Sequence, residues 1–194
     1  RQVRDSIDLS QSGLRFLTID GAWGIPHFVD NQNGFKYAAL VLDGASPVLT
    51  EIDFQDIASS SVLTTGLAQP QFVGGEYIVG NDEDSGVDGP AVQIYSSGTP
   101  ITPLIMSSPV LIGSDNGCGN NAGGKPTVWV EDAFIEIDEA EIPVGDYGIS
   151  LRYSSGSVTN SDISVNCNGI DIYSLKSVGP VSYTHLRAHE TSEN

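Results

Sequence analysis

The stretch Ala133-Phe134-Ile135-Glu136-Ile137-Asp138 alternates apolar with mostly acidic side chains, and it carries the clearest fold signal in the chain. Successive side chains of an extended strand point to opposite faces. Ala133, Ile135 and Ile137 therefore share one face, and the acidic side chains share the other. This pattern is typical of a strand with one buried and one solvated face.

Similar short runs of Val, Ile, Tyr and Phe recur along the chain, separated by Gly, Asn, Asp, Ser and Pro. We expect strands at residues 14–19, 35–42, 48–54, 72–79, 91–95, 101–112, 127–130, 133–137, 147–153, 163–167 and 170–175, and one short helix at 55–63. Asn33-Gly34, Asp43-Gly44 and Asn168-Gly169 are reverse-turn signals. No repeat at a fixed period stands out. With 22 Gly and 10 Pro, the chain is predicted to be all-β, an antiparallel β-sandwich with a jelly-roll-like topology.

Two segments, 140–156 and 163–169, resemble the middle of jelly-roll carbohydrate-binding modules. In the first, Pro143-Val144-Gly145-Asp146-Tyr147 opens a strand that ends in Arg152-Tyr153. In the second, Val165-Asn166-Cys167-Asn168-Gly169 resembles a Val-Asn-Gly turn, interrupted here by a Cys-Asn pair. The resemblance covers under a fifth of the chain. It implies a jelly-roll fold and, as an alternative function, glycan binding.

The charge of the chain excludes whole classes of partner. The formal net charge is −17 and the sequence pI is about 4.1, so the surface repels nucleic acid and anionic membranes. No apolar run has the length of a membrane helix, so no membrane insertion is expected. The chain starts at Arg1 without Met, which predicts that a leader has been removed. Acidity of this kind suits a secreted protein at the cell surface or outside the cell.

The two cysteines predict one disulfide, Cys118–Cys167, because pairing is the default in secreted proteins. Two buried free thiols are the alternative. A loop of about fifty residues closed in this way would stabilise the fold by roughly 4 kcal/mol.

Residues 1–13 form a polar N-terminal arm, in which Val3, Ile7 and Leu9 fall on one face of an extended strand. Such an arm can complete the sheet of a neighbouring copy. A frayed terminus or an edge strand of its own sheet is the alternative. An arm of this type before a β domain resembles subunits of extracellular pilus-like filaments.

Two further places are candidates for ligand binding. Asp82, Asp84 and Asp88 lie in a loop with a bend at Gly86, and their oxygens suit Ca²⁺. A solvated acidic loop is the alternative. Trp23, between Gly21 and Gly24, is a candidate sugar-stacking platform, whereas Trp129 between two valines is predicted to lie in the core or between sheets.

The last residues, 182–194, differ from the rest of the chain. Ser182-Tyr183-Thr184-His185-Leu186-Arg187 resembles adapter read-through at the ends of proteins predicted from environmental sequencing. We therefore expect a β-sandwich domain at 14–181 and a non-native tail at 182–194, whose histidines carry no function.

These features together predict a secreted structural subunit that polymerises head to tail with copies of itself, through exchange of residues 1–13. A carbohydrate-binding or adhesive module is the first alternative, and a calcium-dependent hydrolase the second. The chain is not expected to be an enzyme, because no nucleophile elbow or paired metal histidines occur. No cofactor is required, and Ca²⁺ is the one metal that the sequence suggests.

Overall fold

The computed structural model describes residues 2–4, 14–20, 25–30, 34–55, 57, 59–79, 90–114, 125–173, 182–184 and 187–188, with side chains described only between residues 36 and 173. These residues form strands and turns without a helix, which confirms the all-β prediction. No helix that could span a membrane occurs among them.

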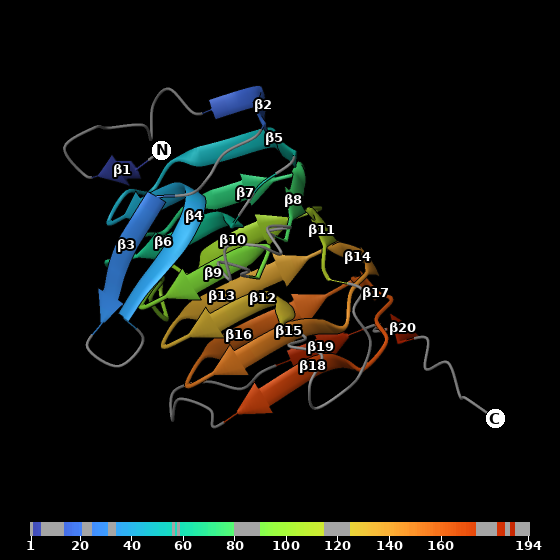
Figure 1. Cartoon of the computed structure of the whole chain (residues 1–194). Coiled ribbons are helices and arrows are strands. Elements are labelled where there is room, and N and C mark those ends of the chain that lie inside the picture. Colours follow the sequence, from blue (N-terminus) through green and yellow to red (C-terminus); the bar gives the residue numbers. More distant parts are fainter. Residues whose placement is uncertain are drawn as a thin grey trace.

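The strands build three parallel sheets, which the chain visits in turn, so that it winds in successive coils (Figure 1). Sheet A contains β1 (Gln2–Arg4), β4 (Gly34–Asp43), β6 (Ser60–Thr65), β9 (Val92–Tyr95), β12 (Pro126–Glu131), β15 (Tyr147–Arg152) and β18 (Asn168–Tyr173), with β3 (Ile25–Asp30) beside β4. Sheet B contains β2 (Leu14–Asp20), β5 (Val48–Gln55), β7 (Gln71–Val73), β10 (Leu104–Ser107), β13 (Phe134–Asp138), β16 (Ser155–Thr159) and β19 (Ser182–Thr184). Sheet C contains β8 (Glu76–Ile78), β11 (Val110–Ile112), β14 (Glu141–Val144), β17 (Asp162–Ile163) and β20 (Arg187–Ala188). The architecture is a parallel β-solenoid.

The predicted antiparallel sandwich is therefore wrong. Among the described strand pairs, only β3 and β4 are antiparallel, and all other pairs are parallel. The physical reason is that a solenoid strand also has one buried and one solvated face, so alternation does not distinguish the two folds. The predicted short helix is also wrong, because β6 occupies the end of that segment.

The coils have a common length in the C-terminal half. Val128 of β12 is the Cα partner of Ile149 in β15, and Ile149 is the partner of Ile170 in β18. Each step is 21 residues, and this period was not recognised in the sequence.

The coils turn from sheet A to sheet B through a residue in the left-handed backbone region. At the corner from sheet A to sheet B these are Gly44, Gly66, Ser96, Asp132 and Tyr153, with φ between 43° and 69°. They occupy equivalent positions, because the strands before them are in register. Asp43-Gly44, predicted to be a reverse turn, is one such corner.

The core lies inside the coils as stacks of identical or similar side chains. Val62, Val92, Val128 and Ile149 stack in register and are all fully buried or nearly so. Burying each such side chain contributes about 1.5–3 kcal/mol. The inward stacks therefore stabilise the coils and fix which side chains point outward.

The start of the N-terminal arm pairs with its own chain. Gln2–Arg4 pair in parallel with Val41–Asp43, which corresponds to the alternative of an edge strand of the same sheet, and strand exchange between copies stays a prediction. The side chain of Val3 is not described, and Ile7 and Leu9 lie outside the described residues. Two short segments of the presumed tail, β19 and β20, pair with β16 and β17 as the last strands of sheets B and C.

Candidate ligand-binding site on the outer face of sheet A

Two columns of outward side chains run across the C-terminal half of sheet A. Val128 and Val130 of β12 point inward and are fully buried. Since successive side chains of a strand alternate between its faces, Trp129 and Glu131 point outward. In register, Trp129 is followed on the next coils by Ser150 and Asp171, and Glu131 by Arg152 and Tyr173. The parallel register thus brings together residues from three coils.

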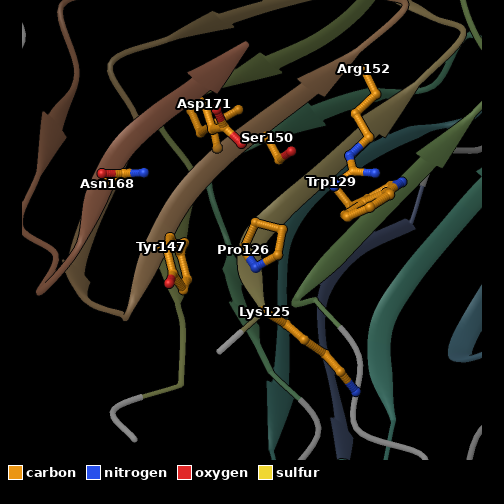
Figure 2. A pocket seen from close by; sticks show the side chains of 9 residues that line it. Lys125, Pro126, Trp129, Tyr147, Ser150, Arg152, Asn168 and Asp171 are labelled. Carbon is orange, nitrogen blue, oxygen red and sulfur yellow. The ribbon is translucent and has the colours of Figure 1, made fainter. Parts of the chain in front are cut away.

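Arg152 is held between two aromatic rings of these columns. Its guanidinium carbon lies 4.1 Å from the centroid of the Trp129 ring and 5.5 Å from that of Tyr173. Both distances are within the range of a cation–π interaction. Figure 2 shows the end of the Arg152 side chain against the Trp129 ring. The Nε atom of Arg152 is buried and has no hydrogen-bond partner among the described residues.

Trp129 is itself fixed from two sides. Its indole Nε1–H donates to a carboxylate oxygen of Glu131 at 3.1 Å. The ring also packs against a second apolar cluster on the outer face of sheet A, formed by Ala38, Val41, Leu63 and Tyr95. A ring anchored in this way holds the guanidinium that lies on it in one orientation.

A pocket of about 230 Å³ opens beside this pair. It is lined by two cations (Lys125, Arg152), two aromatic rings (Trp129, Tyr147), two apolar residues (Pro126, Ile149) and three polar side chains (Ser150, Asn168, Asp171). In Figure 2 Lys125 extends away from Arg152, with Pro126 between them. The two cations therefore mark opposite ends of the pocket.

This pocket gathers positive charge in an otherwise acidic protein. Three cationic residues, Lys36, Lys125 and Arg152, occur among the residues with described side chains, against thirteen Asp and Glu. Two of the three line the pocket. The pocket lining thus carries two cations against one carboxylate, Asp171, a balance opposite to that of the described side chains as a whole, and this favours an anionic group there.

The two corners that precede β15 and β18 are hydrogen-bonded to each other and support one rim of the pocket. The backbone N–H of Cys167 donates to the Asp146 carbonyl at 2.8 Å, and Asn166 donates likewise to Gly145 at 2.9 Å. The Asp146 side chain is fully buried and accepts from Ser114 and Asn166. These bonds fix the start of the strands that present Tyr147 and Asn168 to the pocket.

The residues singled out from the sequence are mostly not in this site. Asp82, Asp84, Asp88, Trp23 and Cys118 lie outside the residues whose side chains are described. Cys167 is disulfide-bonded, and since the chain has two cysteines, this agrees with the predicted bridge, although Cys118 itself is not described. No group of three metal-ligating side chains occurs in the described part of the chain.

Trp129 was predicted to lie in the core or between sheets, and the structure agrees only in part. The ring packs against the apolar cluster of Ala38, Val41, Leu63 and Tyr95, but it is half-buried, points outward and lines the pocket. Its valine neighbours point the other way because the strand alternates. Arg152 was not considered as a site residue, and its rarity as a cation in an acidic chain was the signal that could have found it.

Comparison of the chain with protein-family models, with curated proteins and with solved structures gave no match. The class that the fold and site define is a parallel β-solenoid with a cationic, aromatic pocket on one outer sheet.

Proposed function

We propose that this solenoid binds an acidic saccharide in the pocket on sheet A, outside the cell, without transforming it. The observation that carries the proposal is Arg152, which lines the pocket while its guanidinium is held against the Trp129 ring. A planar guanidinium can bind a carboxylate through two parallel hydrogen bonds. The ordering of the side chain is already in place before the ligand binds, so less entropy is lost on binding.

The rest of the pocket favours a sugar over a simple anion. Ser150 and Asn168 can both donate and accept, and the Asp171 carboxylate accepts only. Asp171 would repel a second negative group, but it suits the hydroxyl donors of a sugar ring. Tyr147 and Pro126 add apolar surface, as pockets for small ligands generally require.

The acidity of the protein limits the affinity for anions. A net charge of −17 repels an anionic ligand at long range, and salt screens this repulsion more than it screens the partly buried contact at Arg152. Binding should therefore persist at physiological salt. The disulfide-bonded Cys167 supports a location outside the cytoplasm.

The test is a titration with D-glucuronic acid and, in parallel, with D-glucose, followed by NMR. The wild-type protein should prefer the uronic acid. Arg152→Ala should lower its affinity roughly ten- to a hundredfold, since a hydrogen bond to a charged group is worth about 1.5–3 kcal/mol. Arg152→Lys, which keeps the charge but loses the planar fork, should fall in between.

Lys36→Ala is the matched control, because Lys36 is the cation that does not line the pocket. It removes the same charge from the protein and should leave the affinity unchanged. Equal affinity for glucose and glucuronic acid, or unchanged binding by Arg152→Ala, would refute the proposal.

Self-assembly is a second candidate. It is favoured by β18, which is the outermost described strand of sheet A and exposes Ile172 and Tyr173. An unpaired edge can add a strand from another copy. Fibres in negative-stain microscopy of the purified protein would support this candidate, and monomers at all concentrations would refute it.

A further inference from the structure

We infer that the site extends past Arg152 onto Tyr173 and is built for an oligosaccharide in which one uronic acid is linked to neutral sugars. This inference rests on the proposed function. It adds the class of ligand, an oligosaccharide, and the direction in which the ligand extends from Arg152.

The extension follows from three side chains on successive coils. Trp129, Arg152 and Tyr173 come from β12, β15 and β18, and Arg152 lies between the two rings. Adjacent strands are about 4.8 Å apart, so this row is directed along the solenoid axis. A ligand that binds Arg152 and reaches Tyr173 lies along the same axis, and a second sugar linked to the uronic acid has the exposed Tyr173 ring within its reach.

Tyr173 has the features of a platform for a sugar ring. Its side chain is 58 % exposed, whereas Trp129 is half-buried beneath Arg152. Tyr153 packs edge-on against it, with the ring centroids 6.3 Å apart and the planes at 90°. This contact orients the ring of Tyr173 while leaving most of it open to solvent. Exposed aromatic rings offer a large contact area at low entropic cost.

Two observations indicate that the sugar on Tyr173 is neutral. Asp171 is two residues before Tyr173 on β18, so both side chains lie on the same face of the strand. Its carboxylate disfavours a second anionic sugar there. The net charge of −17 also repels a ligand more strongly the more charges it carries. A polymer with a carboxylate on every unit is therefore disfavoured relative to one with isolated uronic acids.

The experiment compares four probes by calorimetry: glucuronic acid, xylo-oligosaccharides carrying one glucuronic acid, unsubstituted xylo-oligosaccharides and oligogalacturonate. The singly substituted oligosaccharide should bind about tenfold more tightly than glucuronic acid. The reason is that its neutral sugar adds a contact with the Tyr173 ring, and a contact with one aromatic ring can contribute about that much to the affinity. It should also bind more tightly than the neutral and the fully charged oligomers.

Tyr173→Ala should remove the tenfold gain, whereas Tyr173→Phe, which keeps the ring, should retain it. Because the Tyr173 ring also borders Arg152, Tyr173→Ala should weaken the binding of glucuronic acid as well, but by less than it weakens the binding of the substituted oligosaccharide. Tyr37→Ala, at an exposed tyrosine on β4 outside the pocket, is the matched control and should change neither. Unaltered thermal melting shows that each variant is folded.

The two proposals fail in different ways. If Tyr173→Ala binds the substituted oligosaccharide as tightly as the wild type, or if oligogalacturonate binds best, this inference is overturned while the proposed function stands. If Arg152→Ala binds glucuronic acid normally, both are overturned.

Discussion

Arg152 lies on the ring of Trp129, with 4.1 Å between its guanidinium carbon and the ring centroid. The two residues are diagonal neighbours on β12 and β15, since the register partner of Arg152 is Glu131. Glu131 in turn accepts a hydrogen bond from Trp129. The position of the guanidinium thus depends on a carboxylate that is itself unfavourable for an anionic ligand.

Substitutions of Glu131 should separate these two effects. Glu131→Gln keeps an oxygen that can accept from the indole N–H and removes the negative charge. It should raise the affinity for glucuronic acid about fivefold, because a nearby surface charge is worth on the order of 1 kcal/mol. Glu131→Ala removes the charge and also releases the ring, so its affinity should fall below that of the Gln variant. If the two variants bind equally, Glu131 does not position Trp129.

Tyr77 gives a prediction about stability and pH. Its ring packs in the core against Phe54 and Phe72, with centroid distances of 5.5 and 5.7 Å. Its hydroxyl is buried and has no hydrogen-bond partner among the described residues. Leaving such a group unsatisfied costs about 1–3 kcal/mol. Tyr77→Phe should therefore raise the free energy of unfolding at pH 7, as measured by urea denaturation.

The same variant should change the response to alkali. Burial, followed by the charges of Asp53 and Glu51, raises the pKa of Tyr77 above its ordinary value of 10.0. The unfolded state therefore ionises first, and the stability associated with the neutral hydroxyl is present below pH 10 and lost as the pH rises further. Tyr77→Phe should lose less stability than the wild type between pH 7 and pH 10.5. An equal loss in both proteins would show that this tyrosine does not contribute.

Replacement by alanine should destabilise the protein to very different degrees at two glycines on different strands. A Cβ at Gly156 would overlap the backbone carbonyl oxygen of Ile135 on the neighbouring strand, whereas a Cβ at Gly169 would meet only a methyl group of Ile163 at 3.7 Å. Gly156→Ala should destabilise the protein by about 2–3 kcal/mol or more, and Gly169→Ala by less than about 1 kcal/mol. Urea denaturation of both variants measures the difference. Similar destabilisation would contradict the close approach of β13 and β16.

Much of the strand content could be predicted from the sequence, because each strand needs only local alternation. Residues 48–54 and 91–95 were expected as strands and are strands in β5 and β9. The direction of pairing could not be predicted in this way. Asn33-Gly34 was expected to be a reverse turn, and Gly34 does begin the second strand of the one described antiparallel pair. Asn168-Gly169, which carries the same signal, forms the first two residues of the parallel strand β18.

The signal that was missed is the repeat of 21 residues. Ala133 and Ser154 occupy equivalent corner positions, as do Ala140 and Ser161, and in each pair the serine hydroxyl accepts from the alanine N–H. The repeat is regular only between residues 126 and 173. In the earlier coils, steps of 30 and 36 residues separate Val62, Val92 and Val128, so the period does not persist. The site was missed for the same reason, since without the coil register Trp129 and Arg152 are not neighbours.

The N-terminal arm gives the last prediction. Gln2–Arg4 pair with Val41–Asp43 and so cover part of the edge of β4 in the same chain. Deleting residues 1–13 should expose this edge, lower the melting temperature and increase self-association, because an uncovered edge strand readily pairs with other chains. Size-exclusion chromatography with light scattering measures the association. Deleting residues 189–194, which follow β20, is the control and should have little effect. If instead the intact protein forms fibres and the deletion of residues 1–13 yields a folded monomer, the arm acts by strand exchange between copies, and its pairing with β4 is not the state present in the fibre.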